Sequence, residues 1–163
     1  MDTSHTLLLH DLPPWMVTGT YGAVLHADGS ARVCVGCFSC WVRTPGVCAQ
    51  PDQWSHMGRS IAACDRLWIV SRCLYGGPGP EVKALLDRSI PYMHPDFAIR
   101  GGEMHHKMRL DHHPDLWVLF YGDITQAERE TAGRWARALA RNLDFPLERV
   151  AFYLSAAELE GEL

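Results

Sequence analysis

Four cysteines lie close together in the first third of the chain. Cys34, Cys37 and Cys40 are each separated by two residues, and Cys48 follows after Thr44-Pro45-Gly46, a sequence typical of a turn. Clustered thiolates bind soft metal ions or iron-sulfur clusters. The turn would bring Cys48 back toward the other three, and four thiolates on one loop can surround a [4Fe-4S] cluster.

Two other interpretations of this loop stay open. Structural zinc loops usually consist of two separated C-x-x-C pairs, and only one compact run is present, so iron-sulfur is the better metal assignment. The thiols can also be unligated side chains of a well-packed loop. A disulfide framework is not expected, because the first apolar stretch, Leu7 to Leu9, is far too short for a signal peptide and predicts a cytoplasmic, reduced protein.

A second segment that could bind a ligand runs from Ser71 to Gly79, after a short apolar run. Its glycines would let backbone amides approach a flat ligand, and Tyr75 offers an aromatic face beside it. The same glycines would also suit a tight turn between a strand and a helix without any ligand. A further loop, Tyr121-Gly122-Asp123, ends another apolar run and is predicted at the same edge of a sheet.

Apolar runs alternate with helical patterns along the chain. Strands are predicted at 6–10, within 22–35, and at 67–70, 116–121 and 150–154, and helices after Asp52, from Pro80 and from Thr125 with its capping partner Glu128. Such alternation builds a parallel sheet with helices on both faces and ligand sites at the carboxyl ends of the strands. Residues 95–114 show no clear period and are expected to form a long surface excursion.

The cysteine block from Cys34 to Cys48 resembles that of flavodoxin-fold NAD(P)H-dependent FMN reductases and iron-sulfur flavoproteins. The segment from Ser71 through Lys83 to Asp87-Arg88 is similar to the family's flavin loop and the helix that follows it. The resemblance implies one flavodoxin-like α/β domain over residues 1–163, a three-layer sandwich with about five parallel strands.

It also implies FMN as cofactor, NAD(P)H as electron donor and a possible [4Fe-4S] cluster on the four cysteines. The residues expected to contact the flavin are Ser71, Arg72, Cys73, Tyr75, Gly76, Gly77, Gly79, Tyr121, Gly122 and Asp123. Family members commonly form dimers or tetramers, so a homo-oligomer is expected, with residues 95–114 covering a neighbour. No residue is assigned as a catalytic acid or base.

The chain departs from the family pattern where the FMN phosphate binds. The usual Ser- and Gly-rich loop after the first strand is replaced by Asp11, Pro13 and Pro14, which supply a negative charge and two positions without an N–H. Thr18-Gly19-Thr20 is a weak substitute. Arg72 stands where the family usually has proline. The loss of the usual phosphate loop to Asp11, Pro13 and Pro14 predicts weak FMN binding.

Composition limits the remaining functions. The chain has 163 residues, 47% of them apolar, and a formal charge of −4 with scattered basic residues, so neither nucleic acid nor a membrane is an expected partner. The predicted function is an FMN-dependent oxidoreductase or electron-transfer flavoprotein serving a small-molecule acceptor or a redox partner. The alternative is a flavin-free binding or assembly module. The pairs His105-His106 and His112-His113 are expected to be solvated or hydrogen-bonded rather than metal ligands.

Overall fold

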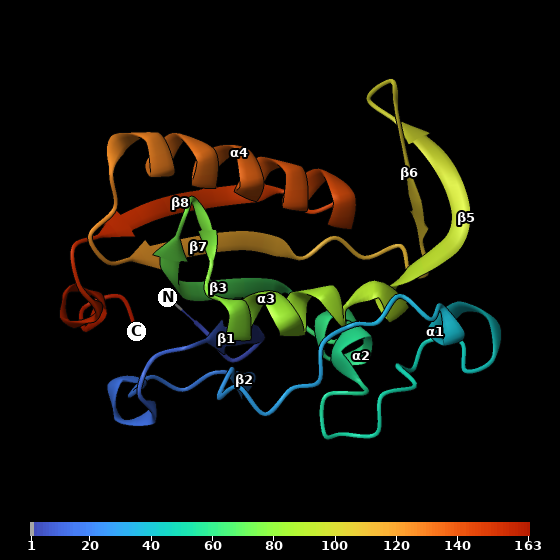
Figure 1. The fold of residues 1–163 in the computed structure, drawn as a ribbon, viewed down its shortest axis with the longest axis horizontal. Helices are drawn as coiled ribbons and strands as arrows, with labels where there is room; N and C mark the ends of the chain where they lie inside the picture. Colours follow the sequence, from blue (N-terminus) through green and yellow to red (C-terminus); the bar gives the residue numbers. More distant parts are fainter. Residues whose placement is uncertain (1) are drawn as a thin grey trace.

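The computed structural model describes residues 2–163 and contains one parallel sheet (Figure 1). Its strands lie in the order β2-β1-β3-β7-β8. Their bounds are β1 (Thr6–His10), β2 (Ala23–His26), β3 (Arg66–Leu74), β7 (Asp115–Tyr121) and β8 (Leu147–Tyr153). The two-residue strand β4 (Gly77–Pro78) pairs antiparallel with the end of β3.

This strand order is that of flavodoxin-like proteins, in which the sheet is extended in both directions from β1 and β3. The predicted flavodoxin-like α/β fold is therefore confirmed. The first strand begins and ends as predicted, because five consecutive buried residues from Thr6 to His10 are followed by Asp11 and a pair of prolines.

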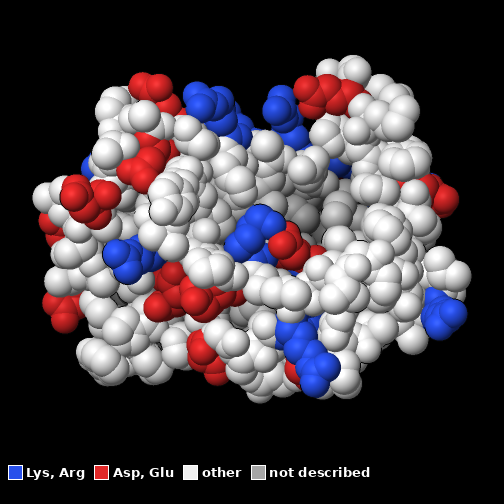
Figure 2. Space-filling view, in the orientation of Figure 1, with Lys and Arg blue, Asp and Glu red and all other residues white. Residues whose placement is uncertain are grey.

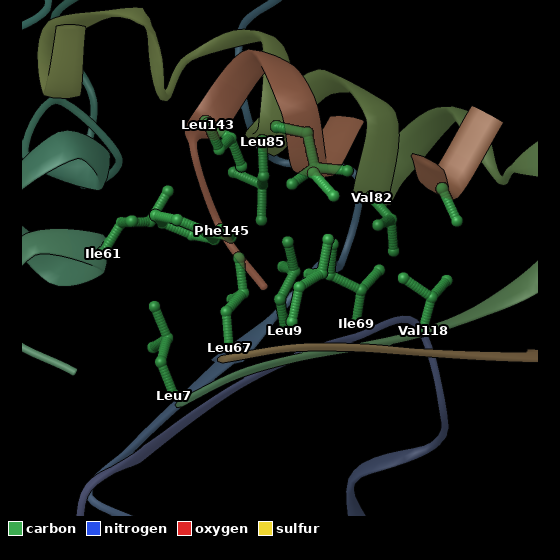
Figure 3. Packing of buried hydrophobic residues seen from close by; sticks show 14 of the residues in the cluster. Leu7, Leu9, Ile61, Leu67, Ile69, Val82, Leu85, Val118, Leu143 and Phe145 are labelled. Carbon is green, nitrogen blue, oxygen red and sulfur yellow. The ribbon is translucent and has the colours of Figure 1, made fainter. Parts of the chain in front are cut away.

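Three α-helices cover one face of the sheet. They are α2 (Met57–Ala62), α3 (Pro80–Asp87) and α4 (Gln126–Leu143). Figure 3 shows Val82 and Leu85 of α3 and Leu143 of α4 above the strand residues Leu9 and Ile69. The helix α4 begins at the predicted capping box, with Thr125 and Glu128 each bonding the other's backbone N–H.

The opposite face of the sheet has a thinner cover. It is formed by the 3₁₀ helices η1 (Pro14–Met16) and η3 (Ala156–Leu159) and the segments beside them, which pack on Leu8, Trp68 and Leu119. After β1, Pro14 begins only the single turn η1, because the β-branched residues and two glycines between Val17 and Gly22 have low helix propensity.

Residues 93–108 form an antiparallel hairpin, β5 (Met93–Arg100) with β6 (Glu103–Met108), that projects from the body in Figure 1. The prediction of an irregular segment was wrong here. Gly101 and Gly102 both have positive φ, as a two-residue hairpin turn requires. Pro95 and a register shift after Met93 break the alternation that would have indicated a strand.

Charged side chains of both signs are interspersed on the face shown in Figure 2. No helix within residues 2–163 has the length and apolar character needed to cross a membrane.

Candidate functional site

The cysteine loop lies at the edge of the sheet where the parallel strands begin, at the right of Figure 1. The chain leaves β2 at the opposite edge, runs along the sheet and forms the short helix α1 (Ser39–Val42). This helix packs against η2 (Ile90–Tyr92), the 3₁₀ turn that follows α3. Trp41 fixes the contact, because its indole N–H donates to the carbonyl of Met93 at 2.9 Å.

All four cysteines line one small pocket in this loop, together with apolar and uncharged residues such as Phe38 and Ile90. Gly36 and Phe38 both have positive φ, so the chain bends once between the first and second cysteines and once between the second and third. The structure thus brings together the four residues that sequence spacing selected. None of the six cysteines of the chain forms a disulfide.

The thiols differ in environment. Burial raises the pKa of the Cys40 thiol, and the neighbouring Cys48, Cys34 and Cys37 raise it further. In contrast, Cys37 is exposed, and a hydrogen bond with the backbone of Ser39 lowers its pKa. Two like-charged thiolates in one pocket repel each other unless a cation lies between them.

Sites for a single ion and sites for a cluster differ in the spacing of their sulfur ligands. Four sulfurs around one zinc ion lie about 3.8 Å apart, given Zn–S bonds of about 2.3 Å. Among residues 2–163, no three His, Cys, Asp or Glu side chains are arranged to hold one metal ion. Ligands of a cubane cluster bind different iron atoms and stand farther apart, roughly 6 to 7 Å. Four thiols without a nearby carboxylate in the lining are a donor set that fits such a cluster.

A buried ion pair holds the base of the cysteine loop. Arg88, with 0% of its side chain exposed, donates to both carboxylate oxygens of Asp52 and to the carbonyl of Arg32, two residues before Cys34. Burial opposes the charge on Arg88, but the bond to Asp52 and the neighbouring Cys48 thiol outweigh it and raise the pKa of the guanidinium. The sequence predicted a helix directly after Asp52, but α2 begins only at Met57, and Arg88 was assigned only to the helix that follows the flavin loop.

The carboxyl edge of the sheet is organised around Asp11. Its carboxylate accepts hydrogen bonds from the Ser71 hydroxyl at 2.8 Å, the Tyr121 hydroxyl at 3.1 Å and the backbone N–H of Arg72 at 3.1 Å. The hydroxyl oxygen of Ser71 in turn accepts the N–H of Gly79 at 2.9 Å. Burial raises the pKa of Asp11, and these donors oppose the rise.

This network lies at the switch point between β1 and β3, where flavodoxin-like proteins bind ligands. A carboxylate therefore takes the donors that a bound phosphate would need. A phosphate dianion placed beside it would be repelled. The groups present at this edge do not fit the FMN phosphate.

The conformation of a tight turn explains why a glycine stands at position 76 of the predicted flavin loop. Tyr75 and Gly76 have φ of 53° and 79° and form the two-residue turn between β3 and β4. A Cβ at Gly76 would lie 2.5 Å from the Cβ of Thr131, so the turn packs directly on α4. The side chain of Tyr75 is 92% exposed.

The other predicted flavin residues are spread over the same edge. Cys73 is buried in the core beneath the helices, while Arg72 and Asp123 are exposed. Gly122 has a φ of 123° and donates its N–H to Tyr153. The two predicted sites lie at opposite ends of α3, whose eight residues span about 12 Å, with Gly79 at its start and Arg88 at its end.

The histidine pairs point in different directions, as expected. His105 contacts Glu103, whereas His106 stacks between Trp41 and Phe97. His112 contacts the carbonyl of Cys64, and His113 contacts that of Asp144. Each ring has a structural partner of its own.

No family model matches the chain, and no curated protein has a significantly similar sequence. The geometry of the site is therefore the main guide to function.

Proposed function

We propose that the protein is an electron-transfer protein whose redox group is an iron-sulfur cluster held by Cys34, Cys37, Cys40 and Cys48. The observation that carries the proposal is the convergence of these four thiols on one pocket free of carboxylates. A cluster bound there would accept and release one electron at a time. The six unpaired cysteines agree with a reducing compartment such as the cytoplasm.

The surrounding residues would position and tune such a group. Arg88 places a permanent positive charge next to Cys48, which would partly offset the negative charge of a thiolate-ligated cluster. Trp41, directly after Cys40, anchors the loop to the carbonyls of Ile90 and Met93. The apolar lining limits the access of water to buried Cys40, whereas Cys37 is exposed, and this hydration would influence the reduction potential of a bound cluster.

We assign FMN only a weak interaction at the carboxyl edge. Asp11 stands in the loop where the family resemblance would place the phosphate, whereas exposed Tyr75 and the loop after β7 would offer contacts for a flat ring. Electron exchange with NAD(P)H through a resident flavin is therefore not part of the proposal. A redox partner or small electron acceptor would instead meet the cysteine loop itself.

Exposed apolar side chains favour self-association. Val33, Val35, Phe38 and Val42 of the cysteine loop are exposed, and so are Phe97, Ile99 and Met104 of the hairpin. Phe38 of the loop lines one pocket together with Phe97 and Met104 of the hairpin, and apolar surface of this kind commonly lies in an interface. We propose that a second copy of the chain covers it.

Anaerobic purification or reconstitution with Fe²⁺ and sulfide tests the cluster. We expect about four iron and four sulfide per chain, with visible absorption that bleaches on reduction. Cys40→Ser should remove most of this iron, and Cys73→Ser, a buried cysteine of β3 outside the pocket, should retain it. Wild-type protein that binds zinc but no iron under these conditions would contradict the proposal.

A further inference from the structure

A groove of about 1040 Å³ lies between α4 and the start of β8. Arg134, Arg137 and Arg141 form one wall, since residues three and four apart share a face of a helix. Phe145 and Pro146 belong to the lining, which is mainly apolar, and His113 lies on it as well. Basic side chains stand along the α4 edge of the molecule in Figure 2.

The positive charge of this wall is largely uncompensated. Among residues 2–163, neither Arg134 nor Arg137 has a carboxylate within 4.0 Å. Arg141 has one contact, at 3.4 Å, with Glu103. The only acidic residue of the groove, Asp144, is already paired with Arg100 at 3.3 Å and lies 3.5 Å from His113.

Stabilisation of the helix α4 explains only one of the three arginines. Arginine in the last turn of a helix interacts favourably with the helix dipole, which accounts for Arg141. Arg134 and Arg137 stand farther from the helix end, where this effect has faded. Arg134 donates only to the hydroxyl of Thr131, and the guanidinium of Arg137 lies over Gly133. Two arginine forks are thus free to bind an anion in a chain whose net charge is −4.

We propose that this groove binds a phosphorylated ligand with an apolar body, of the nucleotide class. Arginine binds phosphate oxygens through paired N–H donors, and neighbouring arginines on one helix face can contact adjacent phosphates. The apolar lining would hold the base, since ligand sites combine apolar walls with a few convergent polar groups. The inference is independent of the cysteine loop and needs no bound cluster.

Calorimetric titration of the full chain with ADP, pyrophosphate and adenosine tests the site. We expect ADP to bind more tightly than either fragment and to weaken as salt increases. Arg137→Gln should raise the ADP dissociation constant about tenfold or more, which corresponds to the loss of one charge-assisted contact. Lys107→Gln is the matched control, because it removes an exposed charge on β6 outside the groove. It should change the ADP dissociation constant less than about twofold.

Three results would overturn the inference. They are no binding of ADP at millimolar concentration, equal weakening by both substitutions, and pyrophosphate binding as tight as that of ADP. Thermal melts of both variants should match the wild type, because both side chains are exposed.

Discussion

The guanidinium of Arg88 lies against the carboxylate of Asp52, with its two terminal nitrogens 2.5 and 2.8 Å from the two oxygens. The same carboxylate accepts the backbone N–H groups of Arg32 and Trp54. One buried pair thus joins the end of α3 to both stems of the cysteine loop. The geometry of the proposed site depends on this pair as much as on the cysteines.

Replacing Asp52 by Asn should lower the free energy of unfolding by about 3 kcal/mol, because it leaves the buried Arg88 charge without its partner. Asp87→Asn is the control: Asp87 pairs with Lys83 on the surface, and both side chains are nearly half exposed, so the cost should stay below about 1 kcal/mol. Urea unfolding at pH 7 measures both values. Equal losses would show that the buried pair has no special role.

The pKa of Asp52 is lowered to about 2, mainly by the hydrogen bond from Arg88. Its stabilising effect is therefore complete above its ordinary pKa of 3.8 and is lost as the pH falls toward 2. The difference in stability between wild type and Asp52→Asn should shrink over this range.

His10 predicts a separate loss of stability in mild acid. Burial, and next the stacked ring of His26, lower the pKa of His10 from 6.5 to about 4. The unfolded chain binds this proton first, so stability should fall by about 3 kcal/mol as the pH drops from 6.5 to 4. His10→Leu should remove this part of the pH dependence in urea unfolding. If the stability of His10→Leu depends on pH as that of the wild type does, other groups cause the loss of stability in acid.

Substitution by alanine should change the stability of the protein in opposite directions at two glycines. Gly133 lies inside α4, and a Cβ there would be 3.6 Å from its nearest neighbour, the Arg137 guanidinium, so Gly133→Ala should stabilise the protein by about 0.5 to 1 kcal/mol. Gly76→Ala should destabilise it, because φ is 79° and the new Cβ would clash with Thr131. Thermal unfolding gives both signs. Stabilisation by Gly76→Ala would exclude the observed packing of the turn on α4.

Thiol reactivity should follow exposure and pKa. In metal-free protein Cys37 should react first with iodoacetamide at neutral pH, because it is exposed and its pKa is lowered. Cys64 should react last, since burial raises its pKa to about 11. Mass spectrometry of time points gives the order, and urea-unfolded protein, in which the differences should vanish, is the control. Early modification of Cys64 would indicate that the core opens readily.

FMN and riboflavin should bind with similar, weak affinity. Each charge-assisted hydrogen bond that the phosphate fails to form forgoes about 1.5 to 3 kcal/mol, so the loss of two raises the dissociation constant a hundredfold or more. Fluorescence titration with both ligands isolates the phosphate, which only FMN carries. Nanomolar FMN binding with much weaker riboflavin binding would reveal a working phosphate site.

The central strands and the longest helix could be predicted from the sequence alone. Short, continuous apolar runs in β1, β3 and β7 are typical of strands covered on both faces of a parallel sheet. Thr125 and Glu128 defined the start of α4 through local bonding alone. The four-cysteine set was also readable, because its members are close in sequence and a single loop can bring them together.

The construction of the candidate sites could not be read from the sequence. The pairing of Arg88 with Asp52 joins residues 36 positions apart, and Ser71 and Tyr121 converge on Asp11 from 60 and 110 positions away. The hairpin β5–β6 escaped prediction because Pro95 and the register shift after Met93 interrupt the alternation, although Gly101-Gly102 is typical of a hairpin turn. Such long-range contacts arise from the packing of the sheet and helices, which brings side chains together irrespective of their spacing in sequence.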